Sequence, residues 1–101
     1  MIEVDLPIPP RRAAGTVPGR VERACAAEGL TRTLKSTLAK YPGCIHWHFK
    51  KGKERGTLEI TWWGRERRLW FKISAGRNGD WMAACVRRLK ERMFRASTEP
   101  G

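Results

Sequence analysis

Hydrophobic and polar residues alternate in three runs between Gly43 and Ser74, which predicts three consecutive β-strands. Successive side chains of a strand point to opposite faces, so the alternation assigns two faces to the resulting sheet. One face is apolar and is expected to form the core: Ile45, Trp47, Phe49, Leu58, Ile60, Trp62, Leu69, Phe71 and Ile73. The other, which we call the open face, carries His46, His48, Glu59, Thr61, Trp63, Arg68, Trp70 and Lys72. We expect a ligand, a partner or the N-terminal arm to cover this unusual set.

A single alignment of the second and third predicted strands pairs apolar residues with one another on the core face and gives favourable pairs on the open face as well. A two-residue turn at Arg65–Glu66 or a four-residue loop over 64–67 gives this register. The pairs are Trp62 with Leu69, Ile60 with Phe71 and Leu58 with Ile73 on the core face, and Trp63 with Arg68, Thr61 with Trp70 and Glu59 with Lys72 on the open face. Trp63 and Arg68 would form a cation–π pair. The first hairpin, aligned in the same way, pairs Trp47 with Ile60 and places His48 beside Glu59.

Helical composition flanks the strands on both sides. Residues 20–40 predict a helix whose apolar stripe changes sides near Gly29, so one broken helix and two separate helices both fit. Thr31 is the candidate cap of the second piece. A turn at 78–79 precedes a last helix with Asp80 as its cap. The predicted fold class is α+β in the order α-β-β-β-α, with a three-stranded antiparallel sheet and the helices on one of its faces.

A length of 101 residues fits one domain. Residues 1–19 are expected to be an extended or mobile arm, because several prolines there withhold backbone donors. The first apolar residues of this arm alternate with acidic ones, a pattern that favours pairing with a sheet edge. Residues 20–95 would form the domain, and residues 96–101 would fray.

The sequence has a formal net charge of +11. This charge points to nucleic acid first, then to an anionic membrane surface or an acidic protein, although a genomic preference for arginine codons would also produce it.

Cys25, Cys44 and Cys85 form no CxxC pair and have apolar neighbours, so each is predicted to be a buried free thiol. The N-terminus does not resemble a signal peptide, and no apolar stretch approaches a membrane span. We therefore expect a cytoplasmic protein without a membrane partner.

Basic residues interleaved with aromatic ones support the first functional hypothesis, a small nucleic-acid-binding domain without a cofactor. Trp63 and Trp70, together with His46 and His48, would form a platform on which bases stack. The basic residues of the interface would be Lys50, Lys51, Lys53, Arg55, Arg65, Arg67, Arg68 and Lys72. Stacking favours single-stranded nucleic acid or RNA as the partner.

Two other functions would use the same open face. Tryptophan and arginine are also enriched in protein interfaces, so a homodimer or an acidic protein partner is the second hypothesis. The third is a metal-dependent enzyme, because His46 and His48 share one strand face beside Glu59 and form a two-histidine, one-carboxylate set. It ranks last because there is no third histidine and nearby cations would oppose a divalent ion. A His48–Glu59 acid–base pair and a Cys44 nucleophile find no further support, so we disfavour an enzyme.

In element order and charge, the region from about residue 30 to residue 95 resembles double-stranded-RNA-binding domains. Those domains carry a proline and a histidine in a hairpin loop and a lysine cluster at the start of the last helix. Here the loop is Lys50–Gly56, without either residue, and the last helix opens Asp80-Trp81-Met82 without lysine. The resemblance therefore rests on the order of elements and the charge alone.

Overall fold

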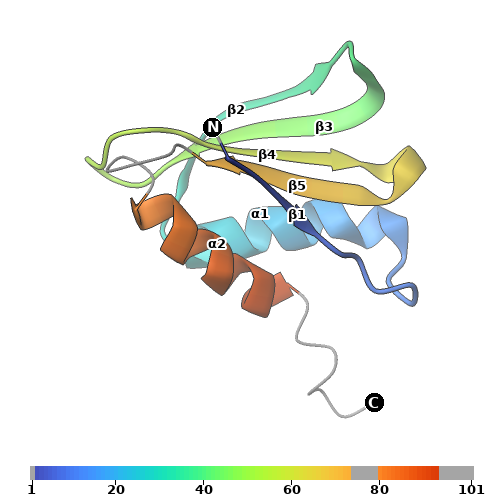
Figure 1. Cartoon of the computed structure of the whole chain (residues 1–101), viewed down its shortest axis with the longest axis horizontal. Helices are drawn as coiled ribbons and strands as arrows, with labels where there is room; N and C mark the ends of the chain where they lie inside the picture. Colours follow the sequence, from blue (N-terminus) through green and yellow to red (C-terminus); the bar gives the residue numbers. More distant parts are fainter. Residues whose placement is uncertain (1, 74–79, 94–101) are drawn as a thin grey trace.

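The computed structural model of the chain describes residues 2–73 and 80–93. Its elements are β1 (Ile2–Leu6), the 3₁₀ turn η1 (Ala14–Thr16), α1 (Val17–Ala27), β2 (Thr31–Leu38), β3 (Tyr41–Lys50), β4 (Leu58–Trp63), the 3₁₀ turn η2 (Gly64–Glu66), β5 (Arg68–Ile73) and α2 (Asp80–Met93). The strands form one antiparallel sheet in the order β1-β5-β4-β3-β2. Both helices lie against the same face of the sheet (Figure 1). The fold is therefore α+β, as predicted, but the predicted three-stranded sheet and element order are wrong.

The predicted helical segment 20–40 is in fact a helix followed by a strand. α1 ends at a Schellman motif, in which Gly29 N–H donates to Ala26 O and Leu30 N–H donates to Cys25 O, each at 3.0 Å. Gly29 has φ 75°, which a glycine adopts without the steric cost of a side chain. The apolar stripe changes sides at Gly29 because the helix stops there and does not resume.

β2 replaces the predicted second helical piece and adds a strand to the sheet. Leu30, Leu34 and Leu38 are four residues apart, a spacing that places side chains on one face of a helix and equally on one face of a strand. The threonines between them favour the strand, because β-branched side chains are restricted in helices. Thr31 is consequently the first residue of β2 rather than a helix cap. With this strand, the order that resembled double-stranded-RNA-binding domains does not hold.

β1 adds the fifth strand. Val4 lies opposite Phe71 and Leu6 opposite Leu69, so the alternating residues of the N-terminal segment pair with the edge of the sheet at β5. Arg67 donates to the carbonyl oxygens of Pro9 and Arg12, at 3.0 and 2.8 Å, which ties the following segment to the β4–β5 turn. α1 then starts at Val17, three residues before the predicted start of the helix.

The predicted register of the central strands is confirmed. Trp47 lies opposite Ile60 and His48 opposite Glu59 in the β3–β4 pair. The β4–β5 pair aligns Trp62 with Leu69, Ile60 with Phe71, Trp63 with Arg68, Thr61 with Trp70 and Glu59 with Lys72. The connection is the four-residue alternative, with η2 followed by Arg67 at φ 51°.

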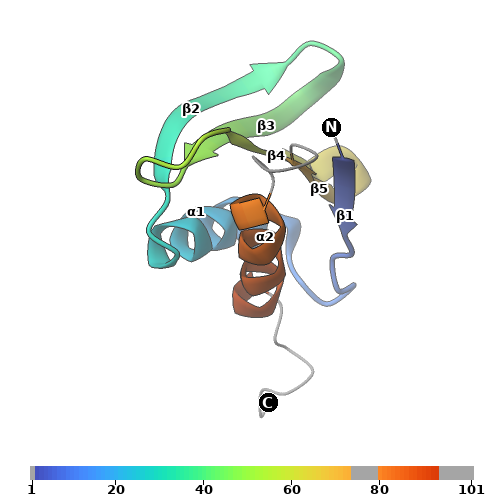
Figure 2. The same ribbon diagram turned by 60° about the vertical axis from the view of Figure 1, so that its left-hand side comes forward.

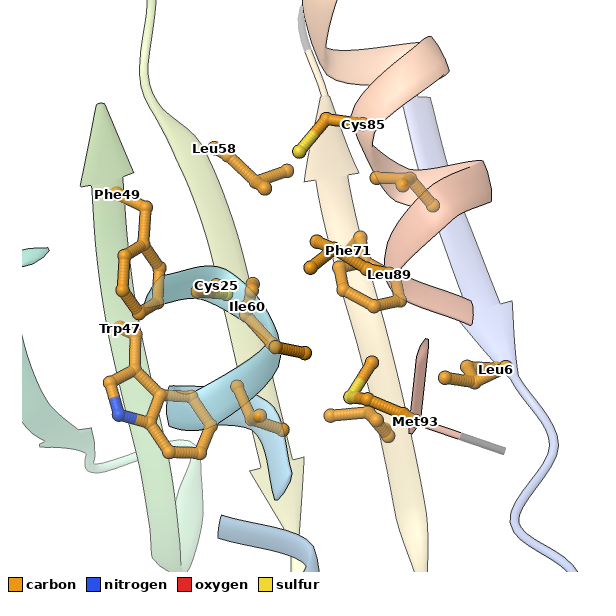
Figure 3. Packing of buried hydrophobic residues seen from close by; sticks show 14 of the residues in the cluster. Leu6, Cys25, Trp47, Phe49, Leu58, Ile60, Phe71, Cys85, Leu89 and Met93 are labelled. Atoms are coloured by element: carbon orange, nitrogen blue, oxygen red, sulfur yellow. The ribbon is translucent and has the colours of Figure 1, made fainter. Parts of the chain in front are cut away.

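The core lies between the helices and the sheet. Figure 3 shows apolar side chains from β1, β3, β4, β5, α1 and α2 meeting in this layer. Trp47 is fully buried, and its indole N–H donates to Glu22 at 3.0 Å. α2 contributes the buried residues Met82, Cys85, Val86, Leu89 and Met93. The three cysteines are buried free thiols, as predicted.

Three further predictions concern the C-terminal part of the chain. α2 begins at Asp80, in agreement with the predicted start of the last helix. The predicted turn at residues 78–79 and the predicted frayed end at residues 96–101 lie outside the described residues.

Neither α-helix in the described part of the chain has the length and apolar character needed to cross a bilayer.

Candidate functional site

The tip of the β2–β3 hairpin lies over part of the open face (Figure 2). The Tyr41 ring meets the Trp63 ring edge-on at a centroid distance of 5.1 Å and the Trp70 ring at 5.0 Å. The indole N–H of Trp63 donates to Pro42 O at 3.0 Å. The hairpin tip therefore contacts both tryptophans of the predicted stacking platform.

Arg68 completes the cover of Trp70. Its guanidinium carbon lies 4.3 Å from the centroid of the Trp70 ring, so the predicted cation–π partner of Trp63 stacks on Trp70 instead. Trp70 is only 2% exposed, whereas Trp63 remains partly exposed. Of the two tryptophans in the predicted platform, only Trp63 presents surface to a ligand in this arrangement.

Tyr41 is the member of this cluster that sequence reasoning missed. Its position predicted a turn between a helix and the sheet, because Pro42 and Gly43 follow it. Strict alternation would also place Tyr41 with Trp47 on the core face. Gly43 has φ 83°, a conformation that breaks the extended backbone and allows Tyr41 to lie over the open face. A glycine near the start of a strand was the one available signal of this change of direction.

Two of the predicted phosphate contacts hold the fold together. Arg68 donates to Asp5 Oδ1 and to Glu3 Oε1, both at 3.0 Å, and thereby joins β5 to β1. Arg67 is engaged by the N-terminal segment, as described above. Neither guanidinium can bind a phosphate with its full set of donors while these contacts persist.

Five of the other predicted cations lie at two opposite ends of the sheet. Lys50, Lys51, Lys53 and Arg55, which we call the basic loop, lie at the β3–β4 connection, whereas Arg65 lies at η2 (Figure 1). None of these residues forms an ion pair with a described carboxylate. Lys53, Arg55 and Arg65 are exposed, while Lys50 and Lys51 are partly exposed.

The basic loop is fixed to the helix layer. The indole N–H of Trp81 in α2 donates to Arg55 O at 2.8 Å, and Glu54 N–H donates to Lys51 O at 2.9 Å. These contacts to backbone carbonyl oxygens fix the path of the loop, while its basic side chains pair with none of the carboxylates in residues 2–73 and 80–93. A positioned loop loses less conformational freedom on binding than an unstructured one.

The two histidines and Glu59 meet at the middle of the open face. His46 Nδ1 is hydrogen-bonded to Thr61 Oγ1 at 2.8 Å, and His46 Nε2 lies 3.0 Å from His48 Nε2. Glu59 Oε1 lies 3.6 Å from His46 Nε2 and 3.8 Å from His48 Nε2. Burial lowers the pKa of His46, and the neighbouring His48 lowers it further. The positions of the three residues along their strands predicted that they would meet, but did not predict the hydrogen bond between His46 and Thr61.

Two further candidate residues, Cys44 and Lys72, have no described contact that would support a chemical role. Cys44 Sγ accepts a hydrogen bond from Leu38 N–H at 3.3 Å and lies 3.8 Å from Thr37 Oγ1. Its described partners are therefore in β2, and no hydrogen bond joins it to His46 in the described residues. Lys72 lies opposite Glu59 but forms no ion pair with a described carboxylate.

Comparisons of the chain with known protein families, with curated proteins and with solved structures found no match.

Proposed function

We propose that this protein binds nucleic acid, with the basic loop as its main phosphate contact. The observation that supports the proposal is the distribution of unpaired charge. Glu3, Asp5, Glu22 and Glu28 are all engaged by basic side chains away from the basic loop. No described carboxylate pairs with the four cations of the loop, so among these residues an anionic ligand displaces no ion pair when it binds there.

Arg65 and Trp63 extend the proposed interface to the other end of the sheet. β4 joins the two ends, and its six residues span about 20 Å. A nucleic acid running along β4 would place phosphates at the basic loop and at Arg65. Trp63, as the partly exposed ring, would supply the stacking contact, which favours an unpaired base there.

A protein interface on the open face has less support. The indole of Trp70 is already covered by Tyr41 and Arg68, so it is not available as the anchor of a homodimer. Arg68, a basic residue of this face, is already paired with Glu3 and Asp5 and therefore offers little charge to an acidic partner.

Gel-shift titration with single- and double-stranded DNA and RNA tests the proposal. The key variant replaces Lys50, Lys51, Lys53 and Arg55 by alanine. Its matched control replaces Arg11, Arg23, Arg87 and Lys90 by alanine, and so removes the same charge from other parts of the surface. We expect the loop variant to lose at least tenfold in affinity and the control to lose less than threefold. Equal losses would show that binding follows net charge alone and would overturn the assigned interface.

A further inference from the structure

His46, His48 and Glu59 come together through the register of two strands. His46 and His48 are alternate residues of β3, so their rings share the open face. Glu59 lies directly opposite His48 in β4. One potential ligand atom from each residue lies within 4.8 Å of the other two. The scaffold on both sides is a paired strand, which holds such a group more precisely than a loop.

The spacing of the three atoms matches the coordination sphere of a small transition-metal ion. The separations are 3.0 Å between the two Nε2 atoms and 3.6 and 3.8 Å from these atoms to Glu59 Oε1. Ligands about 2.0–2.1 Å from a tetrahedral Zn²⁺ lie roughly 3.3 Å apart. A triangle with the observed edges has its centre about 2 Å from each corner, which is the length of a Zn–N or Zn–O bond.

Thr61 provides the outer support that a metal-binding histidine needs. In the tautomer that carries its proton on Nδ1, His46 donates to the Thr61 hydroxyl and keeps a lone pair on Nε2, the atom that faces His48 and Glu59. Thr61 is 2% exposed and His46 is 5% exposed, so neither side chain has much freedom to move.

The local charge does not exclude a cation. Lys72 lies opposite Glu59, and Arg68 is on the same strand, but Arg68 is neutralised by Glu3 and Asp5. Glu59 forms no ion pair with Lys72 among the described residues and contacts the two histidines instead. Its carboxylate therefore offsets one charge of a divalent ion at the site.

We propose that His46, His48 and Glu59 bind a divalent first-row transition metal of the zinc class. The three residues supply three ligands, and the fourth position is left for water or another ligand. The side chains of His48 and Glu59 are 32% and 23% exposed, so solvent reaches the site from the open face. Two histidines and a glutamate with one open position form the ligand set found in several zinc hydrolases. This site is separate from the basic loop and does not depend on the proposed binding of nucleic acid.

Titration of the tag-free, full-length chain with Zn²⁺, followed by calorimetry, tests this assignment. His46 and His48 are the only histidines in the sequence, so imidazole ligation can come from no other residue. We expect one ion per chain, with the affinity reduced at least tenfold by His48→Gln and by Glu59→Gln. Both replacements are at partly exposed positions and keep the side chain polar, and circular dichroism checks that the variants fold.

Co²⁺ in place of Zn²⁺ identifies the ligands independently. We expect the visible absorption of a four-coordinate cobalt site in the native chain and in Cys44→Ser, and its loss in His48→Gln. Thr61→Val, which removes only the bond to His46 Nδ1, should weaken binding by about tenfold. The absence of binding at millimolar Zn²⁺ would overturn the proposal. So would an undiminished affinity in His48→Gln, or a sulfur-to-cobalt band that disappears in Cys44→Ser.

Discussion

Trp47 and Trp70 lie on opposite faces of the same sheet and are both buried, but different structures bury them. Trp47 is enclosed by the helices and the apolar core, and its indole N–H reaches Glu22 of α1. Trp70 is covered by Tyr41 from the hairpin tip and by Arg68 from its own strand. The helix layer contains many mutually supporting contacts. The cover on the open face depends on a few side chains, so it can be removed locally without dismantling the core.

The largest expected effect separates these two tryptophans directly. Trp47→Ala leaves a cavity between the sheet and the helices and should reduce the free energy of unfolding by about 3–5 kcal/mol. Trp70→Ala should cost less, because Tyr41 and Arg68 can move toward the vacated space or into solvent. Urea denaturation of both variants measures the difference. Equal losses would mean that the open face is as tightly packed as the core.

Removal of Tyr41 should uncover the open face. Tyr41→Ala deletes two edge-on ring contacts, each worth about 0.5–1.5 kcal/mol, and so should lower the free energy of unfolding by about 1–3 kcal/mol. It should also increase the quenching of tryptophan fluorescence by acrylamide, because Trp70 becomes accessible. Tyr41→Phe retains the ring and serves as the control. Unchanged quenching in Tyr41→Ala would disprove the role of Tyr41 as a cover.

Glu28 gives a pH-dependent test on the helix side. Hydrogen bonds from Arg88 and Arg92 hold the pKa of this carboxyl below its ordinary value of 4.5. A lowered pKa in the folded state stabilises the protein above pH 4.5, and this contribution disappears as the pH falls through the lowered value. The melting temperature of the native chain should therefore exceed that of Glu28→Gln at pH 7, by a margin that narrows below about pH 4.5. A constant margin down to pH 2 would contradict the ionic role of Glu28.

The ion pairs of Arg68 on the open side should have the smallest effect. Glu3 and Asp5 are exposed, so the double replacement Glu3→Gln with Asp5→Asn should cost about 0–1 kcal/mol, and less at high salt. Urea denaturation at two salt concentrations measures this cost. A loss as large as that of Tyr41→Ala would show that these pairs, rather than the ring, hold the cover in place.

The contrast between the core face and the open face also explains which parts of the structure could be predicted from the sequence. The register of β3, β4 and β5 followed from alternation, because a slip by one residue would have placed apolar side chains of Trp62 or Ile60 opposite polar ones. β2 could not be separated from a helix on leucine spacing, since a separation of four residues fits both structures. Its exposed side chains also lack the two-sided pattern that identified the central strands.

The open face was predictable in composition and less so in its contacts. Strand positions placed His46, His48 and Glu59 together. Alternation gives no information about hairpin bending at Gly43, so it could not show Tyr41 over Trp70. Nor could it indicate that Arg68 and Arg67 would be engaged by residues of the N-terminal segment, because those contacts span more than fifty positions in the sequence.

The salt dependence of binding tests the central claim, that the basic loop contacts phosphates, most directly. If the four cations of the basic loop and Arg65 each neutralise one phosphate, log K should fall against log salt with a slope of about −3.5 for a single strand. Alanine at the four loop positions should make this slope less negative by about 3, whereas the matched control at Arg11, Arg23, Arg87 and Lys90 should leave it unchanged. A slope near zero in the native chain, or equal slopes in the two variants, would contradict the account.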